Sequence, residues 1–186
     1  MTDVFKTFPV LDLGDIVLRE IVRSDVELFF EYIVDPKVSS FIAEEDTPKN
    51  LVEAERELMY WADLFTIKRS LYWGIAKKSN NHLIGTCGFN IWSRTHARTE
   101  ISYDLSRKEW GKGIMTRSVR AICDFAFLRM KVNRIQATVA HYNKPSLKLL
   151  ERLEFQREGN LRKYSILKKE PRDFYMYSLI VDDMKF

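Results

Sequence analysis

Cysteine is scarce in this chain, and the two that occur exclude a disulfide framework. Cys87 and Cys123 are the only cysteines among 186 residues, and they do not form a CxxC pair. Both lie in apolar stretches, so we expect buried free thiols in a reducing compartment. A catalytic cysteine is the alternative interpretation, because the thiolate is a strong nucleophile. A chain of this length can bury a sufficient core without disulfide bridges.

Long uncharged runs are also absent. No stretch of about 18 residues lacks a charge, so we expect no membrane-spanning helix. The first ten residues, MTDVFKTFPV, contain no apolar core of signal-peptide length. Lys and Arg number 30 against 26 Asp and Glu, which gives a net charge of +4 and a pI of about 9.0. This balance suits an anionic ligand or RNA as well as an ordinary soluble surface. We therefore expect a soluble, cytoplasmic protein.

Glycine is the other scarce residue, with seven in the chain, and two of them flank Lys112 just before a helical pattern. The free N–H groups and dipole of a helix N-terminus favour anions, and glycine lets the backbone approach a phosphate closely. Gly111 and Gly113 lack the GxxxxGK[ST] spacing of a Walker A loop, and Thr116 stands where a dinucleotide fingerprint needs its third glycine. Alone, the pair fits either an anion site or a tight turn with a helix cap.

Hydrophobic periodicity predicts one α+β domain over residues 1–186, with a mixed, mostly antiparallel central sheet flanked by helices. Short connections make the three strands between 71 and 105 antiparallel, whereas the helix between 97–105 and 134–140 makes that pair parallel. The predicted strands are 16–21, 71–78, 82–92, 97–105, 134–140, 155–162 and 173–180, and the predicted helices are 24–35, 47–70, 115–126 and 143–153. Ser24 with Glu27, and Thr47 before Pro48, are the expected helix starts.

The sequence around the two glycines resembles the signature of the GNAT acetyltransferase superfamily. The segments TEISYDL, RKEWGKG and NKPSLKLLERLEF are similar to the family's AEIGY strand, (R/Q)xxGxG/A loop and NxxSxxLLExLGF helix. The tail, REGNLRKY followed by RDFYMYSLI, is similar to the Rim-type branch, which includes ribosomal-protein N-terminal acetyltransferases. The resemblance covers about 10–182, with the signature at about 97–156. It implies the acyl-CoA N-acyltransferase fold and direct transfer of an acetyl group from acetyl-CoA to a primary amine, without a metal.

The resemblance implies that acetyl-CoA binds along this signature. Backbone N–H groups of the glycine loop would hold the pyrophosphate, lysines would add charge, and the strand backbone would pair with the pantetheine amides. Asn143 would hydrogen-bond the same arm, or would only cap its helix. The chain departs from the family pattern at Lys108, in place of Arg or Gln, and at Glu154, in place of Gly. The expected cofactor-binding residues are Tyr103, Asp104, Leu105, Lys108, Gly111, Lys112, Gly113, Ile114, Met115, Thr116, Asn143 and Ser146.

The resemblance also implies which residues are catalytic. Acyl transfer needs a base for the amine, a donor for the developing oxyanion and an acid for the thiolate. Glu100 matches the glutamate of the AEI strand and is the expected base, directly or through a water. The alternatives are an outward-facing surface glutamate or one paired with Arg98. The tyrosine that serves many members as the acid falls at Leu150. Ser146 is therefore expected to act as the acid or to orient the thiol, with Tyr103 and Tyr142 as weaker candidates. The expected oxyanion donor is a backbone N–H of the strand that carries Tyr103.

The acceptor is less constrained by the sequence. An α-amine has a pKa of ~7.7–8.0 and a lysine ~10.4, so deprotonating the lysine near neutral pH costs roughly 3 to 4 kcal/mol more. This favours a protein N-terminus, as in a ribosomal protein. The carboxylates of AEED, 43–46, either attract a cationic acceptor such as a polyamine or aminoglycoside, or form an ordinary solvated loop. Phe41 and Trp92 line the acceptor mouth or belong to the core.

A second class of function is a module that binds CoA as a sensor, or contacts RNA, without turnover. The basic segment LRKYSILKK and the missing acid tyrosine favour this alternative. In either case we expect no DNA partner, no membrane association, and a monomer or homodimer.

Overall fold

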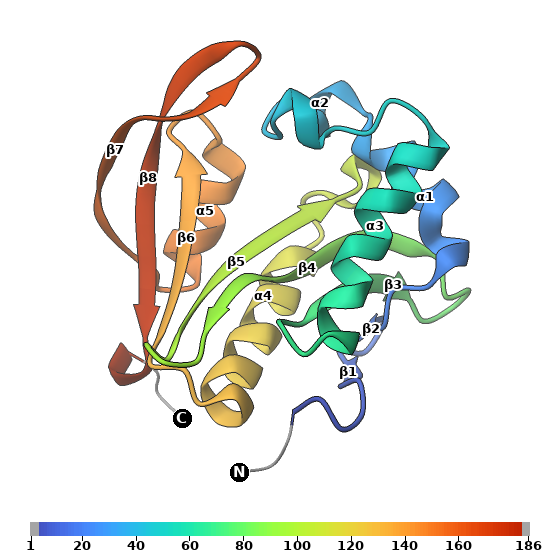
Figure 1. The fold of residues 1–186 in the computed structure, drawn as a ribbon, viewed down its shortest axis with the longest axis horizontal. Coiled ribbons are helices and arrows are strands. Elements are labelled where there is room, and N and C mark those ends of the chain that lie inside the picture. The colour runs from blue at the N-terminus through green and yellow to red at the C-terminus, as the bar shows by residue number, and fades with distance from the viewer. Residues whose placement is uncertain (1–3, 184–186) are drawn as a thin grey trace.

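A sheet of eight strands runs through the computed structural model, which describes residues 4–183 (Figure 1). The strand order is β1-β2-β3-β4-β5-β6-β8-β7, and every neighbouring pair is antiparallel except β5 with β6. The α+β prediction with a mixed, mostly antiparallel sheet is confirmed. The strands are Leu11–Asp12 (β1), Ile16–Arg19 (β2), Tyr72–Lys77 (β3), Leu83–Ser93 (β4), Arg98–Leu105 (β5), Arg134–Ala140 (β6), Gln156–Leu167 (β7) and Glu170–Ile180 (β8).

Helices cover both faces of this sheet (Figure 1). The α-helices are Val26–Ile33 (α1), Pro36–Ser39 (α2), Leu51–Thr66 (α3), Ile114–Phe125 (α4) and Lys144–Arg152 (α5). The pleat of β3 sends consecutive side chains to opposite faces. Trp73 accordingly packs in the apolar cluster that includes α4 and α5, whereas Tyr72 packs in the cluster that includes α1 and α3. The sheet therefore separates two hydrophobic layers.

The parallel pair β5–β6 separates along its length. Backbone pairing joins only Arg98–Glu100 to Arg134–Gln136, although β5 continues to Leu105 and β6 to Ala140. Figure 1 shows the two strands parting beyond this point. Over 101–105, β5 is paired with β4 alone among the described strands. Its other edge therefore carries backbone N–H and C=O groups without a strand partner.

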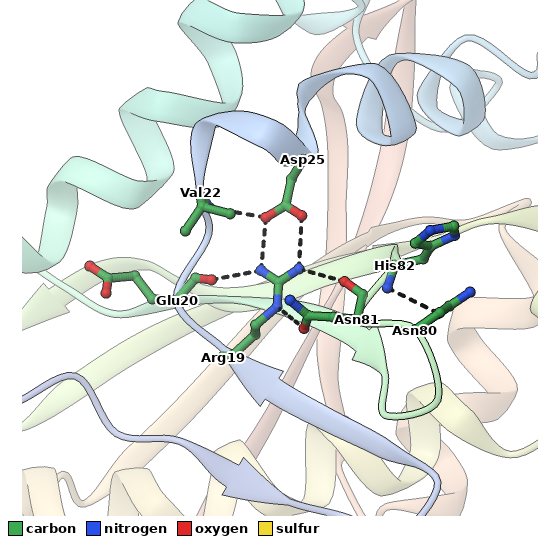
Figure 2. Close-up of polar contacts among 7 residues, drawn as sticks. All are labelled: Arg19, Glu20, Val22, Asp25, Asn80, Asn81 and His82. Carbon is green, nitrogen blue, oxygen red and sulfur yellow. Dashed lines mark hydrogen bonds and ion pairs between the residues drawn. The ribbon is translucent and has the colours of Figure 1, made fainter.

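An arginine network fixes the start of α1 over the sheet (Figure 2). The two terminal guanidinium nitrogens of Arg19 donate to the Asp25 carboxylate at 2.8 Å, and the same side chain donates to Asn81 in the β3–β4 turn. Asp25 also accepts from the backbone N–H of Val22 at 2.9 Å. A 3-10 turn at Arg23–Asp25 therefore precedes α1, and the predicted start at Ser24 is wrong. Asp25, one residue after Ser24, accepts hydrogen bonds from both the Arg19 side chain and the Val22 backbone.

The start of α3 also differs from the prediction. Asn50 caps the helix by accepting from the backbone N–H of Glu53 at 3.0 Å, whereas the Thr47 hydroxyl donates to the carbonyl of Ala43. The sequence contains two possible start signals here, Thr-Pro and Asn-x-x-Glu. The helix begins at the second because the side-chain oxygen of Asn50 reaches a free N–H group of the first turn. The short helix α2 was not predicted; Asp35 caps it directly before Pro36.

The last two strands are longer than the sequence pattern predicts. The predicted strands 155–162 and 173–180 extend to a hairpin that turns only at Lys168 and Lys169. Register shifts interrupt β7 between Arg157 and Gly159 and between Leu161 and Ser165. The full length of β7 was hard to recognise because its residues are mostly exposed, so no buried face marks the strand.

Candidate active site

A cavity of about 1000 Å³ opens where β5 and β6 part. The residues that line it come from both faces of the sheet. From the α4 and α5 side they include Gly111, Gly113, Thr116, Ser146 and Arg152, and from the α1 and α3 side they include Phe41, Asp46, Glu57, Tyr60 and Trp61. The parted strands thus give one cavity that is accessible to groups from both helical layers.

The glycine loop lies at one end of this cavity. Gly113 is the N-cap residue of α4 with φ of 72°, and Gly111 has φ of 78°. A Cβ at either position would meet nothing within 4 Å, so the glycines are required by the backbone conformation rather than by lack of space. Ile114, Met115 and Thr116 of the first turn also line the cavity. Unpaired N–H groups at such a terminus bind anions.

The two predicted lysines of this loop form ion pairs on the surface. Lys108 Nζ lies 2.6 Å from a carboxylate oxygen of Glu31 on α1. Lys112 Nζ lies 3.0 Å from Glu109, which also pairs with Lys77 at 2.7 Å. Burial raises the pKa of Glu109, but the hydrogen bonds from Lys77 and Lys112 outweigh it and hold this pKa below its usual value. Neither Lys108 nor Lys112 is among the described residues that line the cavity.

Two cations on α5 line the cavity instead. Lys148 and Arg152 are four residues apart and therefore share a helix face. An Arg152 guanidinium nitrogen lies 3.4 Å from the Thr116 hydroxyl, which brings α5 close to the start of α4. Neither residue was predicted as part of the site, although their spacing on the predicted helix 143–153 places them on one face.

Two hydroxyls meet across the gap between β5 and α5. Tyr103 Oη and Ser146 Oγ share a hydrogen bond of 2.6 Å, and both residues line the cavity. Asn143 caps α5 by accepting from the backbone N–H of Ser146 at 3.2 Å. Burial raises the pKa of Tyr103, so this phenol stays protonated at neutral pH. The structure therefore brings three predicted site residues together.

Asp104, the next residue on β5, faces the opposite helical layer. Its carboxylate accepts from the Tyr32 hydroxyl of α1 at 2.5 Å and from Thr86 of β4 twice, through the backbone N–H at 3.1 Å and the hydroxyl at 2.7 Å. Burial raises the pKa of Asp104, and these three hydrogen bonds partly oppose the rise. Only the backbone of Asp104 was predicted to contribute to the site. Its side chain anchors α1 to the sheet at the cavity wall.

The α1 and α3 end of the cavity is aromatic and acidic. Trp61 stacks on Tyr72 with ring centroids 4.6 Å apart, and its indole N–H donates to Glu57 at 2.8 Å. Burial raises the pKa of Glu57, and the nearby charges of Asp46 and Asp104 raise it further. Burial also raises the pKa of Asp46. Such a wall favours a cationic group.

Glu100 is the last residue of β5 that pairs with β6. Its carboxylate accepts from Gln136 Nε2 at 2.9 Å and from Thr138 Oγ1 at 3.1 Å, both on β6. Thr138 lines the cavity, so Glu100 is one hydrogen bond from its wall. Within the described residues Glu100 forms no ion pair with Arg98. Its role as the base stays a prediction.

The two aromatic candidates for the acceptor mouth lie in different places. Phe41 lines the cavity, and its ring centroid is 5.9 Å from that of Tyr142. Trp92 packs 5.6 Å from Phe5 and beneath the guanidinium of Arg94. The structure therefore places Phe41 at the cavity and Trp92 beside the core.

Both cysteines are buried, and burial raises the pKa of each thiol. A thiol held in the neutral form is a poor nucleophile, which argues against the alternative of a catalytic cysteine. Over residues 4–183, no group of three or more His, Cys, Asp or Glu side chains is placed to hold a metal ion. In the same range, no helix is both long enough and apolar enough to cross a bilayer.

Comparison with known proteins identifies the family. Residues 15–156, more than half of the chain, match the model described as an Acetyltransferase (GNAT) domain. The chain therefore belongs to the GNAT acetyltransferase family. It is an acetyl-transferring enzyme, and the resemblance inferred from the glycine loop and the NKPS helix is confirmed.

Its relatives and structural neighbours include Rim-type enzymes. The chain is 37% identical over 166 residues to an uncharacterized N-acetyltransferase, p20, from Bacillus licheniformis, covering 89% of this chain and 92% of p20. It is 27% identical over 115 residues to the ribosomal protein uS5-alanine N-acetyltransferase of Escherichia coli, covering 61% and 59% of the two chains. The solved structure of RimL, a ribosomal alpha-N-protein acetyltransferase in complex with coenzyme A, has a TM-score of 0.85 at 20% identity, covering 95% of this chain and 100% of that one.

Removing the Tyr32 hydroxyl should weaken the anchor between α1 and β5. Tyr32→Phe deletes a hydrogen bond to a buried carboxylate, so we expect a loss of ~1.5–3 kcal/mol in the free energy of unfolding. The pKa of Asp104 should rise further, because this donor lowers it. The stability of the wild type then exceeds that of the variant only above the wild-type pKa of Asp104, where the carboxylate is charged. Urea unfolding at several pH values, with an NMR titration of the carboxyl group, measures both effects.

Tyr60→Phe is the matched control, because that side chain lies on α3 and Tyr60 is 55% exposed. It should leave the stability and the pKa of Asp104 unchanged. Equal urea midpoints for Tyr32→Phe and Tyr60→Phe would show that the Tyr32–Asp104 bond does not anchor α1.

Proposed function

We propose that the protein transfers the acetyl group of acetyl-CoA to the α-amine at a protein N-terminus, as the ribosomal-protein acetyltransferases among its relatives do by name. The observation that carries this proposal is the cavity between the parted β5 and β6, with a glycine-opened helix at one end and an acidic, aromatic wall at the other. Two substrates can meet in it from opposite faces of the sheet. A cytoplasmic location follows from such an acceptor.

The residues present fit acetyl-CoA. The volume of about 1000 Å³ suits a large ligand. The N–H groups at Gly111, Gly113 and the first turn of α4 would hold the pyrophosphate. Lys148 and Arg152 would supply the positive charge that the sequence analysis assigned to Lys108 and Lys112. The free edge of β5 at 103–105 would pair with the amides of the pantetheine arm, because an extended chain satisfies an open strand edge.

Acetyl-CoA supplies an activated thioester carbonyl, so the chain itself needs no nucleophile. Glu100 accepts the amine proton through Thr138 or a water, because its carboxylate already bonds to the threonine at the cavity wall. The backbone N–H of Tyr103 donates to the carbonyl oxygen as negative charge develops. Ser146 donates its proton to the leaving sulfur and regains a proton from solvent in the cavity, while the Tyr103 phenol stays protonated and donates a hydrogen bond to the Ser146 oxygen. The two hydroxyls together take the role of the tyrosine that Leu150 replaces.

The acceptor end of the cavity supports a cationic amine. Asp46, Glu57 and the stacked Trp61 and Tyr72 form its wall. An α-amine needs less driving force for deprotonation than a lysine, which suits a site whose base acts through a hydrogen bond. The same carboxylates support a polyamine or an aminoglycoside as the alternative acceptor. A CoA-binding sensor without turnover is the alternative of another class.

Gly113→Val should abolish acetyl-CoA binding while the domain stays folded. Valine is strongly disfavoured at φ of 72°, so the loop must rearrange and withdraw its N–H groups from the cavity. Isothermal titration with acetyl-CoA measures the loss, which we expect to exceed about tenfold.

Gly159→Val provides the control. A Cβ at Gly159 also meets nothing within 4 Å, but this residue does not have a positive φ. The affinity of the Gly159→Val variant for acetyl-CoA should equal that of the wild type. Unchanged affinity in Gly113→Val would mean that the glycines serve only the turn.

Glu100→Gln should lower kcat by about 100-fold or more and leave the affinity for acetyl-CoA unchanged, because it removes the proton acceptor and keeps the side-chain shape. Steady-state rates of acceptor-dependent thiol release provide the measurement. Glu31→Gln, which removes an exposed carboxylate paired with Lys108, is the control and should keep the full rate. A Glu100→Gln enzyme as fast as the wild type would exclude Glu100 as the base.

A panel of acceptors tests the substrate. Peptides that copy ribosomal-protein N-termini should release thiol from acetyl-CoA, whereas the same peptides with a blocked α-amine and a free lysine should not. Turnover with polyamines or aminoglycosides alone would replace the peptide with the alternative acceptor. Tight acetyl-CoA binding without thiol release from any amine would favour the sensor.

A further inference from the structure

The net charge of the chain is concentrated in one hairpin. Residues 161–172, LRKYSILKKEPR, cover the end of β7, the turn and the start of β8. They contain five cations and a single carboxylate, Glu170. Their net charge of +4 equals that of the whole chain, so the charges of all other residues balance. The positive net charge of the protein therefore lies on this hairpin, and the rest of the chain has no net charge.

Most of these cations are free of partners. Arg162, Lys163, Lys168 and Lys169 are exposed, and their side chains form no ion pair with any other residue in 4–183. Only Arg172 is neutralised, by Glu170. Arg162 also lies close enough to Asp173 for its charge to lower the pKa of that carboxyl group, whereas Lys163, Lys168 and Lys169 are left available for a ligand in solution.

The backbone of the hairpin is also unusual. Lys163, Lys168 and Lys169 have φ of 50°, 51° and 62°, in the left-handed region where glycine and asparagine are favoured. A two-residue turn of this kind is normally Asn-Gly. The chain has two lysines there and so combines positive charge with a strained backbone. Turn formation alone does not explain this choice.

Exposed apolar side chains alternate with the cations. Tyr164 is 53% exposed with its ring centroid 5.5 Å from that of Phe174, and Ile166 is 62% exposed. A positively charged surface with an exposed aromatic ring is the combination that binds single-stranded nucleic acid, because phosphates pair with the cations and a base stacks on the ring.

The hairpin also lies at the entrance to the active site. Ser165, Leu167 and Phe174 line the cavity. In Figure 1 the tip of β7 and β8 curves toward α2 on the other side of the parted strands. A strand of nucleic acid on the hairpin would therefore pass beside the acceptor end of the cavity.

We propose that residues 161–172 bind single-stranded RNA, with the phosphates on Arg162, Lys163, Lys168 and Lys169 and a base on Tyr164. An acidic peptide is a poorer fit. Such a peptide would add as a strand to the open edge of β7, and the register shifts at 157/159 and 161/165 interrupt the regular row of N–H and C=O groups that strand addition requires. The RNA site does not depend on the identity of the acetyl acceptor.

Fluorescence anisotropy with a labelled single-stranded oligouridine of about twelve nucleotides tests the site. Four cations on phosphates predict that log Kd rises with log salt concentration with a slope of about 3. The double variant Lys168→Asn/Lys169→Gly removes two charges and installs the favoured turn sequence, so the hairpin stays folded. It should halve that slope. Tyr164→Leu should weaken binding about fivefold or more and keep the slope.

The control Lys6→Gln/Lys49→Gln removes two exposed charges outside the hairpin and should bind as the wild type does. An oligoglutamate peptide of equal charge should bind much more weakly than the RNA. Absence of RNA binding below about 100 µM at low salt, an unchanged slope in the turn variant, or equal affinity for oligoglutamate would each overturn the proposal.

Discussion

The interruption of backbone pairing between β5 and β6 is the constraint on which the rest of the structure depends. Three residue pairs join the strands, and then each continues without the other. Buried backbone groups are rarely left without a partner, so an open edge inside a sheet is stable only where a ligand or solvent reaches it. The parted strands therefore create both a cavity and a row of backbone hydrogen-bonding groups without a strand partner.

Side chains on both faces hold this opening at a defined width. At its closed end, Glu100 of β5 bonds to Gln136 and Thr138 of β6. Further along, Tyr103 reaches Ser146 on α5. These contacts join elements on either side of the gap while the backbones stay apart. The residues proposed for the chemistry therefore also connect the elements on either side of the gap.

The acceptor side depends on a second set of ties, beginning far from the cavity. The bidentate pair between Arg19 and Asp25 fixes the start of α1 against β2 and the β3–β4 turn. One end of α1 is thereby set, and Tyr32 near its other end reaches Asp104. Because α1 is anchored to the sheet near both of its ends, the part of the cavity wall that it forms is fixed in position.

The sequence predicted the glycine loop, the Asn143 helix and the parallel β5–β6 pair because each depends on residues close together in the chain. It failed where the partner lies in another element. Lys108 pairs with Glu31, 77 residues away, and no local pattern reveals that contact. The same applies to the Asp104 side chain, whose hydrogen-bonding partners come from α1 and β4. The hairpin was underestimated because strand periodicity requires one buried face, which β7 lacks over most of its length.

The burial of both cysteines has a practical consequence for studying turnover. Cys87 and Cys123 are enclosed, and burial raises the pKa of each, so neither presents a thiolate at the surface of the folded protein. Reagents such as aromatic disulfides detect coenzyme A by reacting with thiolate. The native enzyme contributes no thiol background to that signal, and a slow colour change in the absence of acetyl-CoA would report unfolding of the enzyme. The two buried cysteines therefore also indicate whether the enzyme stays folded during an assay.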